Sequence, residues 1–294
     1  MKIRSRAAAA AFTLIETIIY AAMGCVVSLI AYSALRSTAA LSVKNTNLNR
    51  SHDDLRAAYD RLARHLLSAN NVPTLVDTSG ATVTTGPAAG FSIDRNLGGP
   101  YVLDPPTTAG SLASTATSIS VWRSVNQLAT APVPAVGEIL LIPTLTGTIR
   151  ATISSVTQFG AGGGLQKITL GLSAPVGKSL SWGNNEPQAA KLVRPEAFIV
   201  MGGELRYYPF FQPLPTLSDP AKYKLMTDQI STQSGEQTPF DVADFNGDKI
   251  MTSTLQVRER RNARWISDDE ANSYNTYFQL HVNLPSRLRP RTTN

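Results

Sequence analysis

A single carboxylate, Glu16, lies near the start of an otherwise apolar stretch, since residues 17–35 carry no charge. A carboxylate within a membrane costs about 2.5–3.5 kcal/mol on insertion scales, so its presence calls for a compensating group. A cut between Ala11 and Phe12 would create a new α-amino group four residues before Glu16. That amine could neutralise the Glu16 carboxylate of a neighbouring subunit, which would make the charge an assembly device.

A second candidate site lies late in the chain, where Asp244, Asn246 and Asp248 place oxygen ligands at alternate positions. Calcium loops use this spacing, but here Lys249 takes the position of their glycine and Leu255 that of their final acid. A β-hairpin with an Asn-Gly turn, flanked by solvated aspartates, accounts for the same residues. The sequence leaves both the calcium site and the plain hairpin open.

No motif in the sequence indicates catalysis. Cys25 lies in the apolar stretch, and the histidines His52, His65 and His281 are scattered, so no Cys/His zinc cluster is evident. Gly-rich phosphate loops in a strand-to-helix context, G-x-S-x-G and H-E-x-x-H are all missing. The acidic run at residues 268–270 indicates a solvated loop. Catalytic groups can converge in space from distant positions, so a membrane-anchored exported enzyme remains an alternative.

The apolar segment that carries Glu16 is expected to be a transmembrane helix over residues 12–36, since a span needs roughly 20 mostly apolar residues. Lys2, Arg4 and Arg6 precede it without any acid. An excess of Lys and Arg marks the cytoplasmic side, so we expect a cytoplasmic N-terminus and a translocated C-terminal part. A signal peptide has a shorter apolar core, so this segment is expected to be retained. An uncleaved signal anchor, in which Glu16 has no role, is the alternative.

The helix is expected to continue through residues 37–71 as an amphipathic half. One helical face is formed by apolar residues at helical spacing, namely Leu48, Leu55, Tyr59, Leu62 and Leu66. Charged residues fill most of the remaining surface. Residues 44–49 contain several Asn and a Thr, which are poor helix formers, so we expect a bend or local melting there.

We expect the remaining residues, 72–294, to form a β-rich exported domain. Residues 74–116 contain loop signals such as Gly98-Gly99-Pro100, so we expect only short strands and irregular connections there. Beyond residue 117, apolar and β-branched runs joined by short turns predict a mostly antiparallel sheet. Residues 135–176 could form a small separate β lobe. The fold class is therefore α+β, with a long N-terminal helix packed on a β-rich globular domain.

The expected strands are bounded by turn signals, of which Met201-Gly202-Gly203 and Asn246-Gly247 are the clearest. They comprise residues 119–125, 138–142, 148–159, 165–172, 192–200, 204–211, 241–245, 249–257 and 274–284. A basic tail with Arg287, Arg289 and Arg291 follows the last of them. This tail is either a frayed end or a contact for DNA or another anionic surface.

The charge balance argues against nucleic acid as the main partner. The chain has a formal net charge of +6, and Lys2, Arg4 and Arg6 supply half of it. Without these residues about +3 remains, which is too little to indicate nucleic-acid binding by itself.

The front of the chain resembles the type IV pilins and the pseudopilins of type II secretion. The resemblance rests on a basic leader, a small residue, Phe12-Thr13-Leu14-Ile15-Glu16 and an apolar helix. It covers about the first 60 residues, and Ala11 stands where the family usually has Gly. The run at residues 61–67 is similar to the helix ends of large minor subunits, such as the J-type pseudopilin or the W-type minor pilin.

This resemblance implies that a prepilin peptidase removes residues 1–11 and methylates the amine of Phe12. It further implies a non-catalytic subunit of a pilus or pseudopilus. Before assembly, this subunit would be held in the inner membrane with its β-rich domain in the periplasm. Its partners would be membrane lipid, the assembly platform and other subunits. The helix would contact the other subunits through Glu16 and small residues. A filament-tip adhesin or DNA-uptake module is an alternative.

Overall fold

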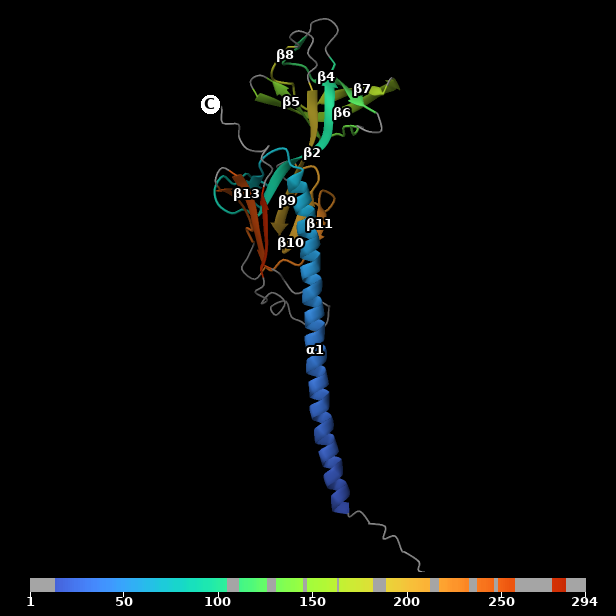
Figure 1. Ribbon diagram of the computed structural model, residues 1–294, viewed down its shortest axis with the longest axis vertical. Helices are drawn as coiled ribbons and strands as arrows, with labels where there is room; N and C mark the ends of the chain where they lie inside the picture. Colours follow the sequence, from blue (N-terminus) through green and yellow to red (C-terminus); the bar gives the residue numbers. More distant parts are fainter. Residues whose placement is uncertain are drawn as a thin grey trace, which may run out of the picture.

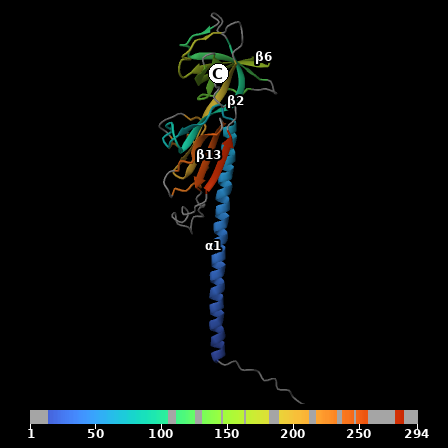
Figure 2. The ribbon, with the colours of Figure 1, turned by 60° about the vertical axis from the view of Figure 1, so that its left-hand side comes forward.

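The computed structural model confirms the α+β fold class: one long helix packs against a β-rich domain (Figure 1). The structure describes residues 14–104, 111–125, 131–144, 147–162, 164–181, 189–211, 217–232, 237–245, 248–256 and 277–283. Figures 1 and 2 show the helix as a shaft that enters a lower lobe, above which a second lobe of strands is stacked.

The helix α1 (Leu14–Leu67) has 54 residues, which corresponds to a length of about 81 Å. Its apolar face is buried as the spacing predicted, with Leu55, Leu62 and Leu66 fully inaccessible. The local melting expected at residues 44–49 was wrong, because α1 continues through them. Contact with the domain begins within this segment and supplies the stabilisation that helix propensity lacks.

The lower lobe contains a five-stranded antiparallel layer whose long central strands are β2 (Gly90–Leu103) and β9 (Ala189–Met201). The flanking strands are β1 (Thr74–Val76), β10 (Glu204–Tyr208) and β11 (Lys224–Thr227). A tight turn joins β9 to β10, where Gly202 and Gly203 have φ angles of 59° and 79°. This confirms the predicted turn, since a two-residue hairpin loop of this type requires positive φ at both positions.

The upper lobe is a closed antiparallel barrel, because the strand pairings return to their starting point in the order β2-β4-β7-β6-β5-β9-β2. Its other strands are β4 (Ser118–Ser124), β5 (Ile139–Thr144), β6 (Gly147–Gly162) and β7 (Leu165–Leu172). Apolar side chains from these strands form one core cluster, as expected for a barrel this narrow. The stretch 135–176 therefore shares its lobe with β4 and with parts of β2 and β9.

Strand β2 corrects the expectation of short strands and irregular connections over residues 74–116. Gly98-Gly99-Pro100 lies inside this strand, where its register against β9 shifts on both sides of Gly98. Gly98 and Gly99 have φ angles of 130° and 143°. The glycines thus form an irregularity of the kind that bends a strand, and β2 continues past it from the lower layer into the barrel.

Pro195 lies in the middle of β9, a position where proline would normally remove a sheet hydrogen bond. Strand β9 pairs with β5 through residues 191–193 and with β10 through residues 197–201. Pro195 falls in the gap between these two partners, so its missing N–H does not interrupt either ladder. The proline therefore marks the junction between the two lobes.

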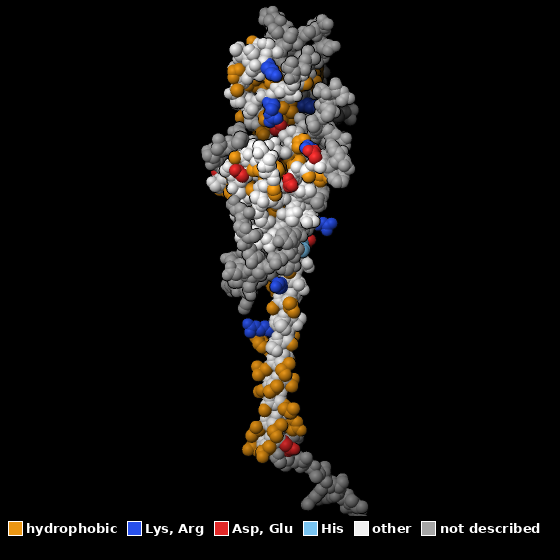
Figure 3. Space-filling view, turned by 90° about the vertical axis from the view of Figure 1, so that its left-hand side faces the viewer, with side chains coloured by type: hydrophobic (Ala, Val, Ile, Leu, Met, Phe, Trp, Pro, Cys, Tyr) orange, Lys and Arg blue, Asp and Glu red, His pale blue; other side chains and the backbone are white. Residues whose placement is uncertain are grey.

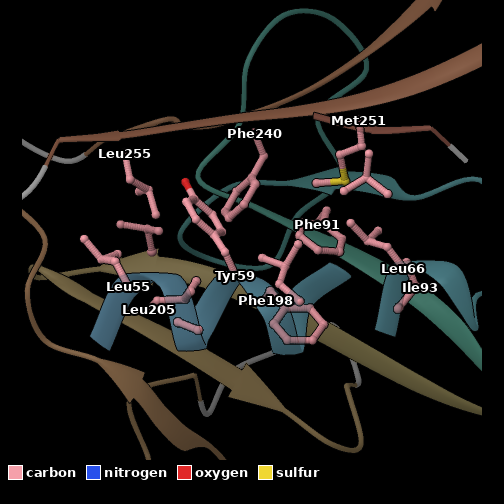
Figure 4. Close-up of a cluster of buried hydrophobic side chains, with 14 of the residues drawn as sticks. Leu55, Tyr59, Leu66, Phe91, Ile93, Phe198, Leu205, Phe240, Met251 and Leu255 are labelled. Atoms are coloured by element: carbon pink, nitrogen blue, oxygen red, sulfur yellow. The ribbon is translucent and has the colours of Figure 1, made fainter. Parts of the chain in front are cut away.

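A second sheet completes the lower lobe and consists of β12 (Phe240–Phe245), β13 (Asp248–Gln256) and β14 (Tyr277–Asn283). Figure 4 shows side chains from α1, from β2, β9 and β10, and from this second sheet in one core. Stacked rings of Phe91 and Phe198, 5.2 Å apart, lie in it. A short pair, β3 (Ser111–Leu112) and β8 (Leu180–Ser181), forms a separate two-stranded sheet.

Candidate functional site

The first half of α1 is exposed, and residues 17–35 within it carry no charge. Every residue from 14 to 46 is exposed, and the large apolar side chains are exposed by 45% (Val43) to 79% (Leu14). This half extends about 50 Å from the lower lobe, more than the roughly 30 Å of a membrane's hydrocarbon core. By length and composition, α1 can cross a membrane. Figure 3 shows apolar side chains along both edges of the exposed half of the helix.

Five hydroxyl groups in this half bond to the helix itself. Thr17 donates to the carbonyl oxygen of Leu14 at 2.8 Å, and Ser33 donates to that of Ile30 at 2.9 Å. Ser37, Thr38 and Thr46 make equivalent bonds to carbonyls three or four residues earlier. A side chain that bonds to its own helix does not need water, so these residues are compatible with lipid or with a neighbouring helix.

Glu16 lies in the first turn of α1, where a negative charge is favoured by the helix dipole. Figure 3 shows an acidic side chain near the lower end of the shaft, with apolar side chains around it. Ala11 and Phe12, the expected cleavage and methylation sites, lie outside the described residues. The pairing of Glu16 with a new amine therefore stays a prediction.

The second half of α1 is fixed to the lower lobe by polar contacts as well as by its apolar stripe. Tyr59 is 2% exposed, and its hydroxyl shares a hydrogen bond of 2.9 Å with the Ser253 hydroxyl of β13. Burial raises the pKa of Tyr59, against a smaller opposing effect of Ser253, so the phenol stays neutral. The Ser51 hydroxyl lies 3.3 Å from Oε1 of Gln229, near the start of the docked half.

A buried carboxylate, Glu196 of β9, connects the end of α1 to the sheet. Its oxygens lie 2.6 Å from Nδ1 of His65 and 3.2 Å from Nη1 of Arg95, and its side chain is fully inaccessible. The ring of His65 also packs against Phe198 and Tyr207. Sequence reasoning treated His65 as an isolated histidine, because nothing in the spacing of residues 65, 95 and 196 indicates that they meet.

The calcium candidate falls on a β-hairpin, as the hairpin interpretation predicted. Phe245 of β12 pairs with Asp248 of β13 across the turn, and Asp244 pairs with Lys249. The Lys249 ammonium forms an ion pair with the Asp244 carboxylate, so a calcium ion there would have to displace it. Asn246 lies outside the described residues, as do the acidic run 268–270 and the basic tail. Calcium binding at this hairpin stays a prediction.

A groove of about 900 Å³ lies at the junction of the two lobes, beside Pro195. We call it the waist groove. Its lining comprises Asn71, Thr74, Val76, Gly80, Thr82, Ser92, Ile93, Asp94, Val136, Gly137, Ile139, Arg150, Thr152, Ile153, Ser154, Ser173, Pro195 and Phe211. The charged groups in this lining are Asp94 of β2 and Arg150 of β6, which form an ion pair with each other. Figure 3 shows basic and acidic side chains together at the waist between the lobes.

Comparison with known proteins found no matching family model, no matching curated protein and no matching solved structure.

Proposed function

We propose that the chain is a non-catalytic minor subunit of a pilus-like or type II secretion pseudopilus filament. Its first half of α1 lies in the inner membrane before assembly, with the β-rich domain in the periplasm, and packs among the helices of other subunits afterwards. Leader cleavage after Ala11 and methylation of Phe12 by a prepilin peptidase precede assembly. The assembly platform and membrane lipid are its other partners.

The observation that carries this proposal is the division of one uninterrupted helix into two environments. Residues 14–46 are exposed and residues 17–35 among them carry no charge, while an apolar stripe of residues 48–66 is buried in the lower lobe. An exposed apolar surface of this extent requires an apolar surrounding. Lipid meets that requirement before assembly, and neighbouring helices meet it in a filament through van der Waals packing.

Glu16 adds a requirement that lipid alone does not meet. A carboxylate in a membrane is stabilised by a cationic partner, and cleavage between Ala11 and Phe12 would supply one on an adjacent subunit. The pair would form only between molecules in the correct axial register. Glu16 would therefore select the assembled arrangement over a free subunit in the bilayer.

The test uses the full-length chain in a host that has a prepilin peptidase and its filament system. Mass spectrometry of the purified protein is expected to find a methylated Phe12 at the N-terminus. Glu16→Ala is expected to be inserted and processed, but to be lost from isolated filaments. Thr17→Ala is the matched control, since Thr17 is the neighbouring exposed residue and its hydroxyl donates to the carbonyl oxygen of Leu14 in the same helix.

Two results would contradict the proposal. The first is native protein that still carries residues 1–11 after extraction from the membrane. The second is incorporation of Glu16→Ala into filaments at the level of Thr17→Ala.

A further inference from the structure

The waist groove presents a guanidinium group that is held in place. Nη2 of Arg150 donates to Oδ1 of Asp94 at 3.0 Å, and Nη1 donates to Oδ2. Arginine has five N–H donors, and these two bonds leave others directed away from Asp94. The Arg150 side chain is 51% exposed. A ligand in the groove can therefore accept hydrogen bonds from a guanidinium group that is already ordered.

Asp94 is itself fixed from several sides. Its residue is 4% exposed, its amide donates to Oδ1 of Asn71 at 2.6 Å, and its carbonyl accepts from the amide of Asn70 at 2.7 Å. These contacts join β2 to the segment that follows α1. Pre-organisation of this kind lowers the entropic cost of binding a ligand.

The other polar groups of the groove are uncharged. They are the hydroxyl groups of Thr74, Thr82, Ser92, Thr152, Ser154 and Ser173 and the amide of Asn71. Each hydroxyl can both donate and accept a hydrogen bond. Because Asp94 and Arg150 neutralise each other, the described lining has no net charge and gives no advantage to an ionic ligand. It suits a neutral ligand that carries many donors and acceptors.

The apolar residues of the groove are mostly flush with its surface. Val76, Ile139, Ile153 and Phe211 are at most 8% exposed, whereas Val136 at the rim is 60% exposed. An apolar floor beside many hydroxyl groups matches the face of a sugar ring, which presents C–H groups on one side and hydroxyls around its edge.

The edge of β1, which borders the groove, is already occupied. The amide of Val83 donates to the carbonyl of Leu75 at 2.8 Å, and Val76 forms a bridge with Thr82. Addition of a peptide strand to a sheet requires a free edge. This argues against an extended peptide as the ligand.

From these observations we infer that the waist groove binds a neutral carbohydrate, with the Asp94–Arg150 pair and the surrounding hydroxyl groups as its polar contacts. The volume of about 900 Å³ lies within the range of small-molecule sites. This inference does not depend on the subunit role. Glu16→Ala is expected to bind the sugar normally, so failure of one proposal is distinguishable from failure of the other.

The test measures binding of defined sugars to the full-length chain in a detergent without a sugar headgroup. The probes are mono- to tetrasaccharides of glucose, galactose, mannose and N-acetylglucosamine, together with galacturonic acid, sialyllactose and tetraalanine. Saturation-transfer NMR identifies the ligands, and calorimetry gives their Kd. Ser154→Tyr and Thr82→Tyr fill the groove from the barrel and from the lower lobe. Thr148→Tyr, at an exposed position of β6 outside the lining, is the matched control.

At least one neutral sugar is expected to bind, and each groove variant should weaken it by about tenfold or more through lost hydrogen bonds and occluded volume. Thr148→Tyr should bind like the wild type. Absence of binding by every neutral sugar would overturn the inference. So would equal affinity in the groove variants, or tighter binding of the charged sugars or of tetraalanine.

Discussion

Replacement of Glu196 by Gln tests how the end of α1 is held to the domain. The substitution keeps the size of the side chain and removes its charge. Glu196 is fully buried and lies 3.2 Å from Arg95, which corresponds to an attraction of about 5 kcal/mol at an effective dielectric constant of ~20. Desolvation of the carboxylate offsets much of this attraction in the wild type. The variant would lose the attraction and leave Arg95 without its anion.

Removal of one partner of a buried ion pair typically costs about 3–5 kcal/mol. Arg95 and His65 retain 30% and 20% exposure, so water partly solvates them after the change. We therefore expect Glu196→Gln to lower the free energy of unfolding by about 3 kcal/mol, at the lower end of that range.

The assay is urea denaturation of the full-length protein in detergent, followed by near-ultraviolet circular dichroism. Glu204→Gln is the matched control. Glu204 lies on β10, the neighbour of β9, is 30% exposed, and pairs with Arg206 of the same strand at 2.8 Å. Water reaches the Glu204 carboxylate but not that of Glu196, so we expect the loss of its charge to cost nearer the ~1 kcal/mol of solvent-accessible pairs. An equal loss in both variants would refute the reasoning, because it would show that burial of Glu196 does not matter.

Three further predictions concern stability. Leu62→Ala, at a fully buried position of α1, should cost about 2–5 kcal/mol, and Leu67→Ala, which is 54% exposed, should change the same urea midpoint little. Gly90→Ala would place a methyl group 2.5 Å from the carbonyl oxygen of Phe198, and the resulting shift of β2 against β9 should cost about 1–3 kcal/mol in thermal unfolding. Burial opposes a low pKa at Asp104, but hydrogen bonds from the neighbouring lysine and tryptophan outweigh it and lower that pKa. Asp104→Asn should therefore destabilise the protein at pH 7, and its deficit relative to wild type should shrink as the pH falls below the pKa of an unfolded aspartate; a constant deficit would contradict this.

The long helix and the regular hairpins could be predicted from the sequence because their signals are local. The spacing of Leu55, Tyr59 and Leu62 is a property of neighbouring residues on one helix, and all three are buried. Residues 165–172 were predicted as a strand with the bounds that β7 has. The Gly-Gly turn after Met201 is likewise a local signal, because a two-residue hairpin loop of this type requires positive φ angles, which glycine adopts readily.

Features that depend on distant residues could not be predicted in this way. Gly98-Gly99-Pro100 has the composition of a loop, and only its pairing with β9 makes it part of a strand. Closure of the barrel depends on β2 meeting both β4 and β9, which no local pattern specifies. The waist groove needs Asp94 and Arg150 to meet across 56 positions of sequence.

The two halves of α1 are linked mechanically, and this connects its burial to the proposed assembly. No break separates the exposed half from the docked half, so the position of Glu16 relative to the domain is fixed by contacts more than 30 residues away in sequence. A helix that could slide along the lower lobe would lose the Ser51–Gln229 and Tyr59–Ser253 contacts together. Specific polar contacts of this kind define an axial register more sharply than an apolar stripe does. If Glu16 pairs with a terminus on the next subunit, that register determines where each β-rich domain lies along the filament.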